Sequence, residues 1–313
     1  MDIAIAILSV IGGLVLLTFG GDKLVDGAIT LGRHFKLSDV FIGIVIVGFG
    51  TSLPEMMAGV VAAKQESAAL VLGNMIGSNI ANIGLVLATG LLLIKAHQKK
   101  VKSMALDYTL MLLASVIFAF LLYTGREVSA VEGSIMMALL FVLLSGSYLY
   151  AVKTHVEAPL EYDEDEIPLV KAFTFVFLGI VGLYIGAELL VSGAIFIASK
   201  MGISERVIGL TMVAIGTSLP ELAATFAAAR KSGLGLVLGN VCGSNMFNLL
   251  AGVGLAATVY PLEAVDVVLD VSIMGFFSLA MMMLFFIKDR HLHIAGTLFL
   301  VGYAGYLSFL GAG

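Results

Sequence analysis

Residues 50–55 read Gly-Thr-Ser-Leu-Pro-Glu, and the same six residues recur at positions 216–221. The offset of 166 between the copies also relates Gly27-Ala28 to Gly193-Ala194, Ile42-Gly43 to Ile208-Gly209, Gly73-Asn74 to Gly239-Asn240, Gly77-Ser78-Asn79 to Gly243-Ser244-Asn245, and Asn82 to Asn248. A single register that holds over so many positions indicates an internal duplication, with one copy of the same structural unit in each half of the chain.

The composition around these motifs is typical of a membrane protein. Of the 313 residues, 60% are hydrophobic and 12% are charged, whereas soluble domains carry about 25% charged residues. Apolar runs of about 20 residues, long enough to cross a bilayer, recur from end to end and predict an all-α membrane protein without a separate soluble domain. The ten transmembrane helices are expected at residues 3–24, 39–63, 68–92, 104–123, 131–151, 169–191, 206–229, 234–258, 265–287 and 294–311. The first run has no basic start, so it is interpreted as a span and not as a signal peptide.

The number of spans determines how the two copies are related. Each copy contains five spans, and since five is odd, the second copy must enter the membrane in the opposite orientation to the first. The sequence therefore predicts two inverted five-helix repeats, residues 1–151 and 169–313, joined by a linker at 152–168. Inverted repeats are a common plan of secondary transporters, in which the substrate site lies near the bilayer midplane between the repeats.

Basic residues between the spans predict the orientation of the chain. If alternate loops lie on opposite sides, one side carries Arg33, Lys36, Lys95, Lys99, Lys100, Lys102, Lys153, Lys171, Arg230, Lys231, Lys288 and Arg290. The other side carries only Lys64, Arg126, Lys200 and Arg206. By the positive-inside rule the first group is cytoplasmic, so both termini lie outside and the linker lies inside. We expect the membrane to be the inner (plasma) membrane of a prokaryotic cell.

The linker is the most polar stretch of the chain. Between Pro159 and Pro168 it carries Glu161, Asp163, Glu164, Asp165 and Glu166. Carboxylates at this density repel one another, so a solvated tether is the simpler interpretation. A Ca2+-sensing segment is the alternative.

Glu55 and Glu221 lie in the middle of their predicted spans. An ionisable group at that depth costs about 2.5 to 3.5 kcal/mol on insertion scales, so it needs a partner. No lysine or arginine lies in the middle of a span, and all five histidines fall in loops or at span ends. A bound cation or a proton is therefore expected to neutralise the two carboxylates.

Further oxygen-bearing side chains accompany each glutamate. On a helix, Thr51 and Ser52 lie one turn before Glu55 and share its face. Ser78 and Asn82 likewise share one face of the next span. The matched residues in the second half are Thr217, Ser218, Ser244 and Asn248. All of these groups offer oxygen, which suits hard cations such as Ca2+ and Na+ and disfavours Zn2+ or Cu+.

Pro54 and Pro220 directly precede the two glutamates. Proline removes a backbone N–H and clashes with the carbonyl four residues earlier, so both helices are expected to break there and to free carbonyls near Gly50 and Gly216. Broken helices persist at membrane depth where the freed groups face a cavity or a ligand.

Two other matched sets have roles that the sequence leaves open. Asp22 and Glu188 lie near the predicted span ends, where capping, snorkelling and gating are alternative roles. Close approach of neighbouring helices is the expected role of Gly73, Gly77, Gly239 and Gly243.

At these motifs the sequence resembles the cation/Ca2+ exchanger superfamily, and specifically the prokaryotic Na+/Ca2+ exchangers. Residues 50–55 with 73–79 resemble the first alpha-repeat of that family, and residues 216–221 with 239–245 resemble the second. The resemblance covers essentially the whole chain. It implies a ten-helix fold in which the first and sixth helices slide against a core of eight, and a secondary antiporter that exchanges Na+ for Ca2+ by alternating access.

The resemblance also implies a set of ion ligands. Glu55 and Glu221 would bind Ca2+ and share in Na+ binding. Hydroxyl groups for Na+ would come from Thr51, Ser52, Thr217, Ser218, Ser78 and Ser244. Remaining ligands would be the backbone carbonyls of Gly48 and Ala214 and the side chains of Asn82 and Asn248. Ca2+ and Na+ are then the transported ions, and the protein is surrounded by membrane lipid. Neither a cofactor nor an obligate protein partner is expected.

Two differences within the superfamily bear on the coupling ion. K+-dependent exchangers and some prokaryotic relatives have Asp at the position of Asn248, so Asn argues against K+ cotransport. H+/Ca2+ exchangers typically have a glutamate where this chain has Gly77 and Gly243. Proton coupling through the same glutamates is thus disfavoured but stays as the alternative, followed by a passive Ca2+ channel.

Other functional classes find little support. The chain has no His-Glu-x-x-His motif, nucleophile elbow or phosphate-binding loop, so an enzyme is not expected. The single cysteine, Cys242, excludes an internal disulfide and a cysteine-based metal cage. The chain also lacks a basic block of the kind that binds nucleic acid.

Overall fold

The computed structural model describes residues 2–94, 104–154, 167–202, 216–263 and 267–312. Within these residues, nine helical segments are long and apolar enough to cross a membrane, at Ile3–His34, Asp39–Lys64, Ala68–Leu93, Ala105–Gly125, Ala130–Tyr150, Leu169–Lys200, Leu234–Val259, Val268–Phe285 and Leu292–Leu310. The remaining predicted span, 206–229, begins outside the described residues, and helix α11 (Leu219–Lys231) is its described part. The predicted all-α membrane fold is confirmed.

Each half of the chain forms a set of helices of similar order. The elements of the first half are α1 (Ile3–His34), α2 (Asp39–Ile42), η1 (Gly43–Gly48), α3 (Phe49–Lys64), α4 (Ala68–Ala81), η2 (Asn82–Leu87), α5 (Ala88–Leu93), α6 (Ala105–Gly125), β1 (Glu127–Val128) and α7 (Ala130–Thr154). The described elements of the second half are α8 (Leu169–Lys200), α11, α12 (Leu234–Met246), η5 (Phe247–Val253), α13 (Gly254–Val259), β2 (Leu262–Glu263), α14 (Val268–Ala280), η6 (Met281–Phe285), η7 (Asp289–His291) and α15 (Leu292–Ala312). The predicted linker lies largely outside the described residues, which omit 155–166.

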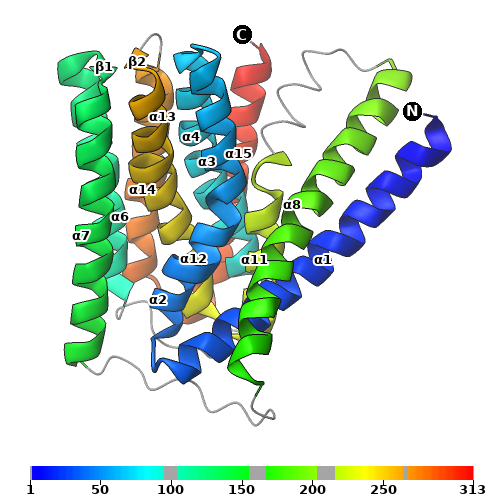
Figure 1. Ribbon diagram of the computed structural model, residues 1–313, viewed down its shortest axis with the longest axis horizontal. Helices are drawn as coiled ribbons and strands as arrows, with labels where there is room; N and C mark the ends of the chain where they lie inside the picture. The colour runs from blue at the N-terminus through cyan, green and yellow to red at the C-terminus, as the bar shows by residue number, and fades with distance from the viewer. Residues whose placement is uncertain (1, 95–103, 155–166, 203–215, 264–266, 313) are drawn as a thin grey trace.

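The first helices of the two halves, α1 and α8, pack closely along their length (Figure 1). A Cβ atom on Gly13 would lie 2.7 Å from the backbone nitrogen of Leu190, and one on Gly27 would lie 2.7 Å from the carbonyl oxygen of Ala172. An early residue of α1 therefore meets a late residue of α8, and the reverse, so the two helices are antiparallel. Matched helices that run in opposite directions are what an inverted repeat requires.

Both of these helices are longer than the sequence predicted. The first and sixth spans were expected to end near residues 24 and 191, but α1 continues to His34 and α8 to Lys200. Asp22 and Glu188 consequently lie well before the helix ends, so the predicted helix ends and a capping role for these two residues were wrong. The polar residues of α1 form contacts with neighbouring helices, as when Lys23 Nζ lies 4.1 Å from the centre of the Phe175 ring. Such contacts allow the helix to continue through them.

The short strands β1 and β2 connect the two halves at one end of the molecule. They form an antiparallel pair in which Glu127 lies opposite Glu263 and Val128 opposite Leu262. Each strand belongs to a connection between spans, before α7 and before α14 respectively. Both strands and both chain termini lie at the same end of the bundle, as the predicted alternation of the spans requires (Figure 1).

Three of the membrane-crossing segments contain a stretch of π-helix, in which the backbone hydrogen bond reaches one residue further than in an α-helix. The stretches η2 and η5 occupy matched positions in the two halves, and η1 lies just before α3. The predicted break at Pro54 is wrong for the first half, because α3 continues through this proline. In the second half, Pro220 lies in the first turn of α11, where its missing N–H costs nothing. The irregular backbone nearest to Pro54 therefore lies upstream, at η1.

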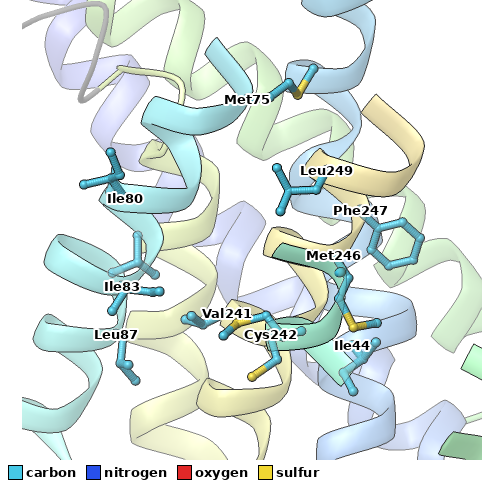
Figure 2. Packing of buried hydrophobic residues seen from close by; sticks show 14 of the residues in the cluster. Ile44, Met75, Ile80, Ile83, Leu87, Val241, Cys242, Met246, Phe247 and Leu249 are labelled. Atoms are coloured by element: carbon cyan, nitrogen blue, oxygen red, sulfur yellow. The ribbon is translucent and has the colours of Figure 1, made fainter. Parts of the chain in front are cut away.

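A tightly packed apolar core holds the helices that bear the repeated motifs. Figure 2 shows Ile44 of η1, Ile83 of η2 and Met246 of α12 within this core. A Cβ atom on Gly243 of α12 would lie 2.6 Å from the Cα of Ile44, so the backbones of α12 and η1 are in contact. Gly239 makes a similar backbone contact with Val40. The predicted close approach of helices is thus confirmed for these two glycines, and it places the motifs of the two halves beside each other. It is wrong for Gly73 and Gly77, where a Cβ atom would have no neighbouring atom within 4 Å.

Candidate functional site

Glu55 and Glu221 meet where the two halves join. Glu55 lies on α3 and Glu221 in the first turn of α11, and both side chains are 1% exposed. The helices α3 and α11 are in contact, and the two carboxyl groups lie close enough to interact directly. Ser52 Oγ on α3 donates a hydrogen bond to Glu221 Oε1 at 3.3 Å. The structure thus brings together the two acids that the duplication singled out.

Buried oxygen atoms without a hydrogen-bond partner belong almost entirely to the predicted ligands. In the described part of the chain, seven of the eight such side-chain oxygens are Glu55 Oε1 and Oε2, Ser78 Oγ, Asn82 Oδ1, Ser218 Oγ, Glu221 Oε2 and Asn248 Oδ1, and the eighth is Ser278 Oγ. The elements that carry the predicted ligands contact one another, α3 with α4, α11 and η5, and α11 with η2. Leaving a buried polar atom unsatisfied costs about 1 to 3 kcal/mol, so this many unpartnered oxygens on contacting elements indicate a site for a ligand that accepts electron pairs from oxygen.

A second group of predicted residues is linked by hydrogen bonds around Gly48. Thr51 Oγ1 lies 3.4 Å from the Gly48 carbonyl oxygen and 3.4 Å from Ser244 Oγ. Ser244 Oγ also lies 3.3 Å from the Gly48 carbonyl. Gly48 ends the π-helical stretch η1, and its carbonyl accepts from hydroxyl groups of both halves. The irregular backbone therefore places the Gly48 carbonyl among hydroxyl groups of both halves in the interior of the membrane domain.

Two predicted residues differ from the rest. Thr217 lies in the turn before α11 and is partly exposed, whereas its counterpart Thr51 is fully buried in a helix. Ala214 lies outside the described residues. The other predicted residues of the second half, Ser218, Glu221, Ser244 and Asn248, are all buried.

Two asparagines that were not among the predicted ligands contact the backbone of the two glutamates, and they form a layer behind the carboxylates. Asn74 Nδ2 donates to the backbone carbonyl of Glu55 at 3.3 Å, and Asn240 Nδ2 donates to that of Glu221 at 3.4 Å. Asn240 Nδ2 also lies 2.9 Å from Thr225 Oγ1. The recurrence of Asn74 as Asn240 was a signal that could have found this layer. No such signal exists for Thr225, because the matched residue in the first half is a glycine.

None of the ion pairs described in the structure involves Glu55 or Glu221. The ion pairs described in the structure join Lys231 to Asp22 and Asp26, at the end of α11 remote from Glu221. Among the described residues, no three His, Cys, Asp or Glu side chains lie together as they would around a transition metal. Two carboxylates surrounded by amide, hydroxyl and carbonyl oxygens instead form a set suited to hard cations of low charge.

Comparisons with known proteins agree with this arrangement. The family described as "Sodium/calcium exchanger protein" matches the chain twice, at residues 5–149 and 171–312. The chain is 31% identical to the sodium/calcium exchanger MaX1 of Methanosarcina acetivorans, covering 88% of this chain and 89% of that protein. It is 34% identical to the inner membrane protein YrbG of Escherichia coli, covering 84% of this chain and 82% of that protein. Its fold superposes on a solved structure of the sodium-calcium exchanger NCX_Mj with a TM-score of 0.81 at 30% identity, covering 98% and 99% of the two chains.

Proposed function

Because the chain belongs to the sodium/calcium exchanger family, and is therefore a multi-pass membrane protein that transports cations, we propose that it exchanges Na+ for Ca2+ by alternating access. The observation that carries this proposal is the group of unpartnered oxygens around Glu55 and Glu221. Carboxylate, amide and hydroxyl oxygens are the ligands that Ca2+ and Na+ accept, and a buried set of them has little other use. The ions are the substrates, and the proposal includes no cofactor and no obligate protein partner.

The ligands in this proposal come from both halves. Glu55 and Glu221 bind Ca2+ and take part in Na+ binding, and Asn82 and Asn248 complete the centre. The hydroxyl groups are those of Thr51, Ser52, Ser78, Thr217, Ser218 and Ser244. Backbone carbonyls come from Gly48 and, by the symmetry of the repeats, from Ala214. The two repeats, 1–151 and 169–313, are the units whose relative arrangement defines the site.

Charge neutralisation makes the exchange obligatory. With both glutamates ionised, the empty site carries a charge of about −2 in an apolar setting, where charge is costly. One Ca2+ or two Na+ restore neutrality, and both loads compete for the same oxygens. The helices α1 and α8, joined to each other through backbone contacts at their glycines, then slide as a pair against the rest of the bundle. Sliding is suppressed while the site is charged, so a Ca2+ ion crosses only in exchange for other cations.

The coupling ion is tested by Ca2+ uptake into vesicles that contain the purified protein. An outward Na+ gradient should drive 45Ca2+ accumulation, and replacing internal Na+ by K+ or choline should abolish it. An imposed pH gradient without Na+ should give no accumulation. Uptake driven by the pH gradient alone would favour the H+/Ca2+ antiporter, and equilibration of 45Ca2+ without any counter-ion would favour a passive channel.

The orientation of the chain is part of the same proposal. We place both termini outside and the linker at 152–168 in the cytoplasm of a prokaryotic cell, in the inner (plasma) membrane, since the more basic loops then face inward. Proteolysis of sealed inside-out and right-side-out vesicles tests this arrangement, because a tag at either terminus should be cleaved only from the outer side.

A further inference from the structure

Four asparagines form a reciprocal network at the junction of the halves. Asn79 Nδ2 donates to the backbone carbonyl of Asn245 at 3.2 Å, and Asn245 Nδ2 lies 3.5 Å from the backbone carbonyl of Asn79. Asn248 Nδ2 donates to Asn79 Oδ1 at 3.1 Å, and Asn82 Nδ2 donates to Asn245 Oδ1 at 3.1 Å. All four side chains are buried. Each half thus forms hydrogen bonds with asparagine side chains of the other half.

The orientation of the amides in this network follows from its backbone contacts. A carbonyl oxygen only accepts hydrogen bonds, so Asn79 must turn its NH2 group toward the Asn245 carbonyl. Its Oδ1 then faces Asn248, and because that oxygen also only accepts, Asn248 must present its NH2 group to it. The Oδ1 of Asn248 is then left without a hydrogen-bond partner among the described residues. The stretch η5, which carries Asn248, contacts α3, which carries Glu55.

The mirror-image chain ends in the same way. Asn245 is anchored on the carbonyl of Asn79, and its Oδ1 accepts from Asn82. The Oδ1 of Asn82 is then left without a hydrogen-bond partner among the described residues, as in Asn248. Both ends of the network therefore leave an amide oxygen, and not an NH2 group, without a partner, on elements that contact the glutamate-bearing helices α3 and α11.

We propose that Asn79 and Asn245 are positioning residues, which hold Asn248 and Asn82 with their amide oxygens turned toward the transported cation. This inference rests on the proposed function, in which Asn82 and Asn248 are ligands. An amide is nearly symmetric in shape, so without an orienting partner it can turn over and present N–H donors to the site. Donors repel a cation, so the site would lose a ligand and gain a repulsive group. The network prevents the amides from turning over. Asn82 and Asn248 can thus act as oxygen ligands without a third carboxylate at the site.

The inference is tested by equilibrium binding of 45Ca2+ to the purified protein in Na+-free detergent solution. Asn79→Leu keeps the approximate volume but removes the acceptor for Asn248, and we expect Ca2+ affinity to fall at least about tenfold, the effect of losing one good ligand. In an Asn248→Asp background the residue at 248 has two equivalent oxygens, so its orientation no longer matters. There, Asn79→Leu should change the affinity less than threefold. An equal loss in both backgrounds would indicate a purely structural role and overturn the proposal, as would no loss in either.

Asn79→Asp is the matched control. A carboxylate can accept from Asn248 Nδ2 but cannot donate to the Asn245 carbonyl, so the orientation of Asn248 is kept while the anchor is lost. We expect this variant to bind Ca2+ at least fivefold more tightly than Asn79→Leu, and equal affinities would contradict the proposal. If Asn79→Leu does not fold, the mirror-image cycle of Asn245→Leu with Asn82→Asp, together with Asn79→Asp, decides the question. Failure of the wild-type protein to bind 45Ca2+ would instead reject the proposed function itself.

Discussion

The two halves of the molecule share their motifs but differ in their contacts at the site. In the first half, Thr51 is fully buried within α3 and lies within hydrogen-bonding distance of Asn240 Oδ1 and Ser244 Oγ. In the second half, Thr217 lies in a turn before α11 and is partly exposed. A symmetric sequence has therefore adopted an asymmetric arrangement. That is the behaviour expected of an inverted-repeat transporter, in which each half takes a different conformation and the two exchange them.

The glutamates show the same asymmetry on a smaller scale. Glu221 Oε1 accepts a hydrogen bond from Ser52, whereas both carboxylate oxygens of Glu55 lack a partner among the described residues. If the two halves play equivalent parts over a transport cycle, the two acids should be equally essential in spite of their unequal contacts.

The most severe test of this equivalence is the removal of one charge at a time. Glu55→Gln and Glu221→Gln should each lower Na+-driven 45Ca2+ uptake by more than about 100-fold, because the loss of one partner in a buried set of charges costs several kcal/mol. Size-exclusion profiles and thermal unfolding should show that both proteins stay folded, since the amide is isosteric and removes a buried charge. Near-normal uptake by either variant would exclude that glutamate from the site, and with it the equivalence of the halves.

A finer test exploits the difference between Thr51 and Thr217. Thr51→Val removes a hydroxyl that contacts the Gly48 carbonyl, Asn240 and Ser244. We expect uptake to fall about tenfold, corresponding to about 1.4 kcal/mol for the lost hydrogen bonds. Thr217→Val, the matched change in the second half, should lower uptake by a similar factor, because the halves exchange conformations over a full transport cycle and Thr217 then takes the place of Thr51. A much smaller loss for Thr217→Val would mean that the two halves are not equivalent.

The inverted architecture could be predicted because the signals for it are independent of tertiary structure. A constant offset identifies the copies, and an odd number of spans dictates their opposite orientation. The same offset selected Glu55 with Glu221 and Asn82 with Asn248, all of which carry unpartnered oxygens in the structure. It also selected Ser78, which carries one, and its counterpart Ser244, which instead contacts the Gly48 carbonyl. These residues could be identified because polar groups in the middle of a membrane span are energetically costly and usually have a functional role.

Other features depend on contacts that a sequence does not display. Residues 82–87 are as apolar as an ordinary helix, so nothing in them distinguishes the π-helical stretch η2. Asp22 and Lys23 were interpreted as the end of a span because polar residues usually lie at the membrane surface, yet α1 continues through them. Pro54 was expected to break its helix, but the helix tolerates the loss of one hydrogen bond when it is packed on several sides.

Thr225 and Gly59 occupy matched positions, so substitutions there compare the residues behind Glu221 with those behind Glu55. Thr225 Oγ1 accepts from Asn240, which in turn contacts the backbone of Glu221. Thr225→Val should lower uptake about fivefold, or about 1 kcal/mol, because Asn240 Nδ2 loses the shorter of the two hydrogen bonds that it donates. Gly59→Ala is the counterpart in the first half. Its Cβ would lie 2.5 Å from Met75 Cε, the mobile end of a flexible side chain, so an effect below about twofold is expected. A larger effect of Gly59→Ala would place the sensitive packing in the first half instead.

The smallest expected effect concerns an ion cluster that joins α1 and α11 in the described part of the chain. Lys231 Nζ on α11 lies 3.2 Å from Asp22 Oδ1 and 2.7 Å from Asp26 Oδ1 on α1. The matched residue in the first half is Gln65, which carries no charge, whereas Asp22 is matched by the acidic Glu188. The cluster therefore links α1 to α11 at one end of the molecule. Gln65, at the matched position of the first half, has no charge with which to form an equivalent ion pair. It should favour the conformation in which α1 and α11 are in contact.

Lys231→Gln makes this position alike in the two halves. Partly exposed ion pairs contribute about 0 to 1 kcal/mol, so the ratio of half-saturating Ca2+ concentrations on the two sides of the membrane should shift by about two- to fivefold. Lys231→Arg keeps the charge and should leave the ratio unchanged, while Asp26→Asn should shift it in the same direction by less, because Asp22 still contacts Lys231. The shift should also shrink at high ionic strength, where the wild-type cluster is itself weakened. If the charge-removing and charge-keeping variants at 231 behave alike, the cluster has no part in the balance between conformations, and the asymmetry of the site must arise from the packing around Thr51 alone.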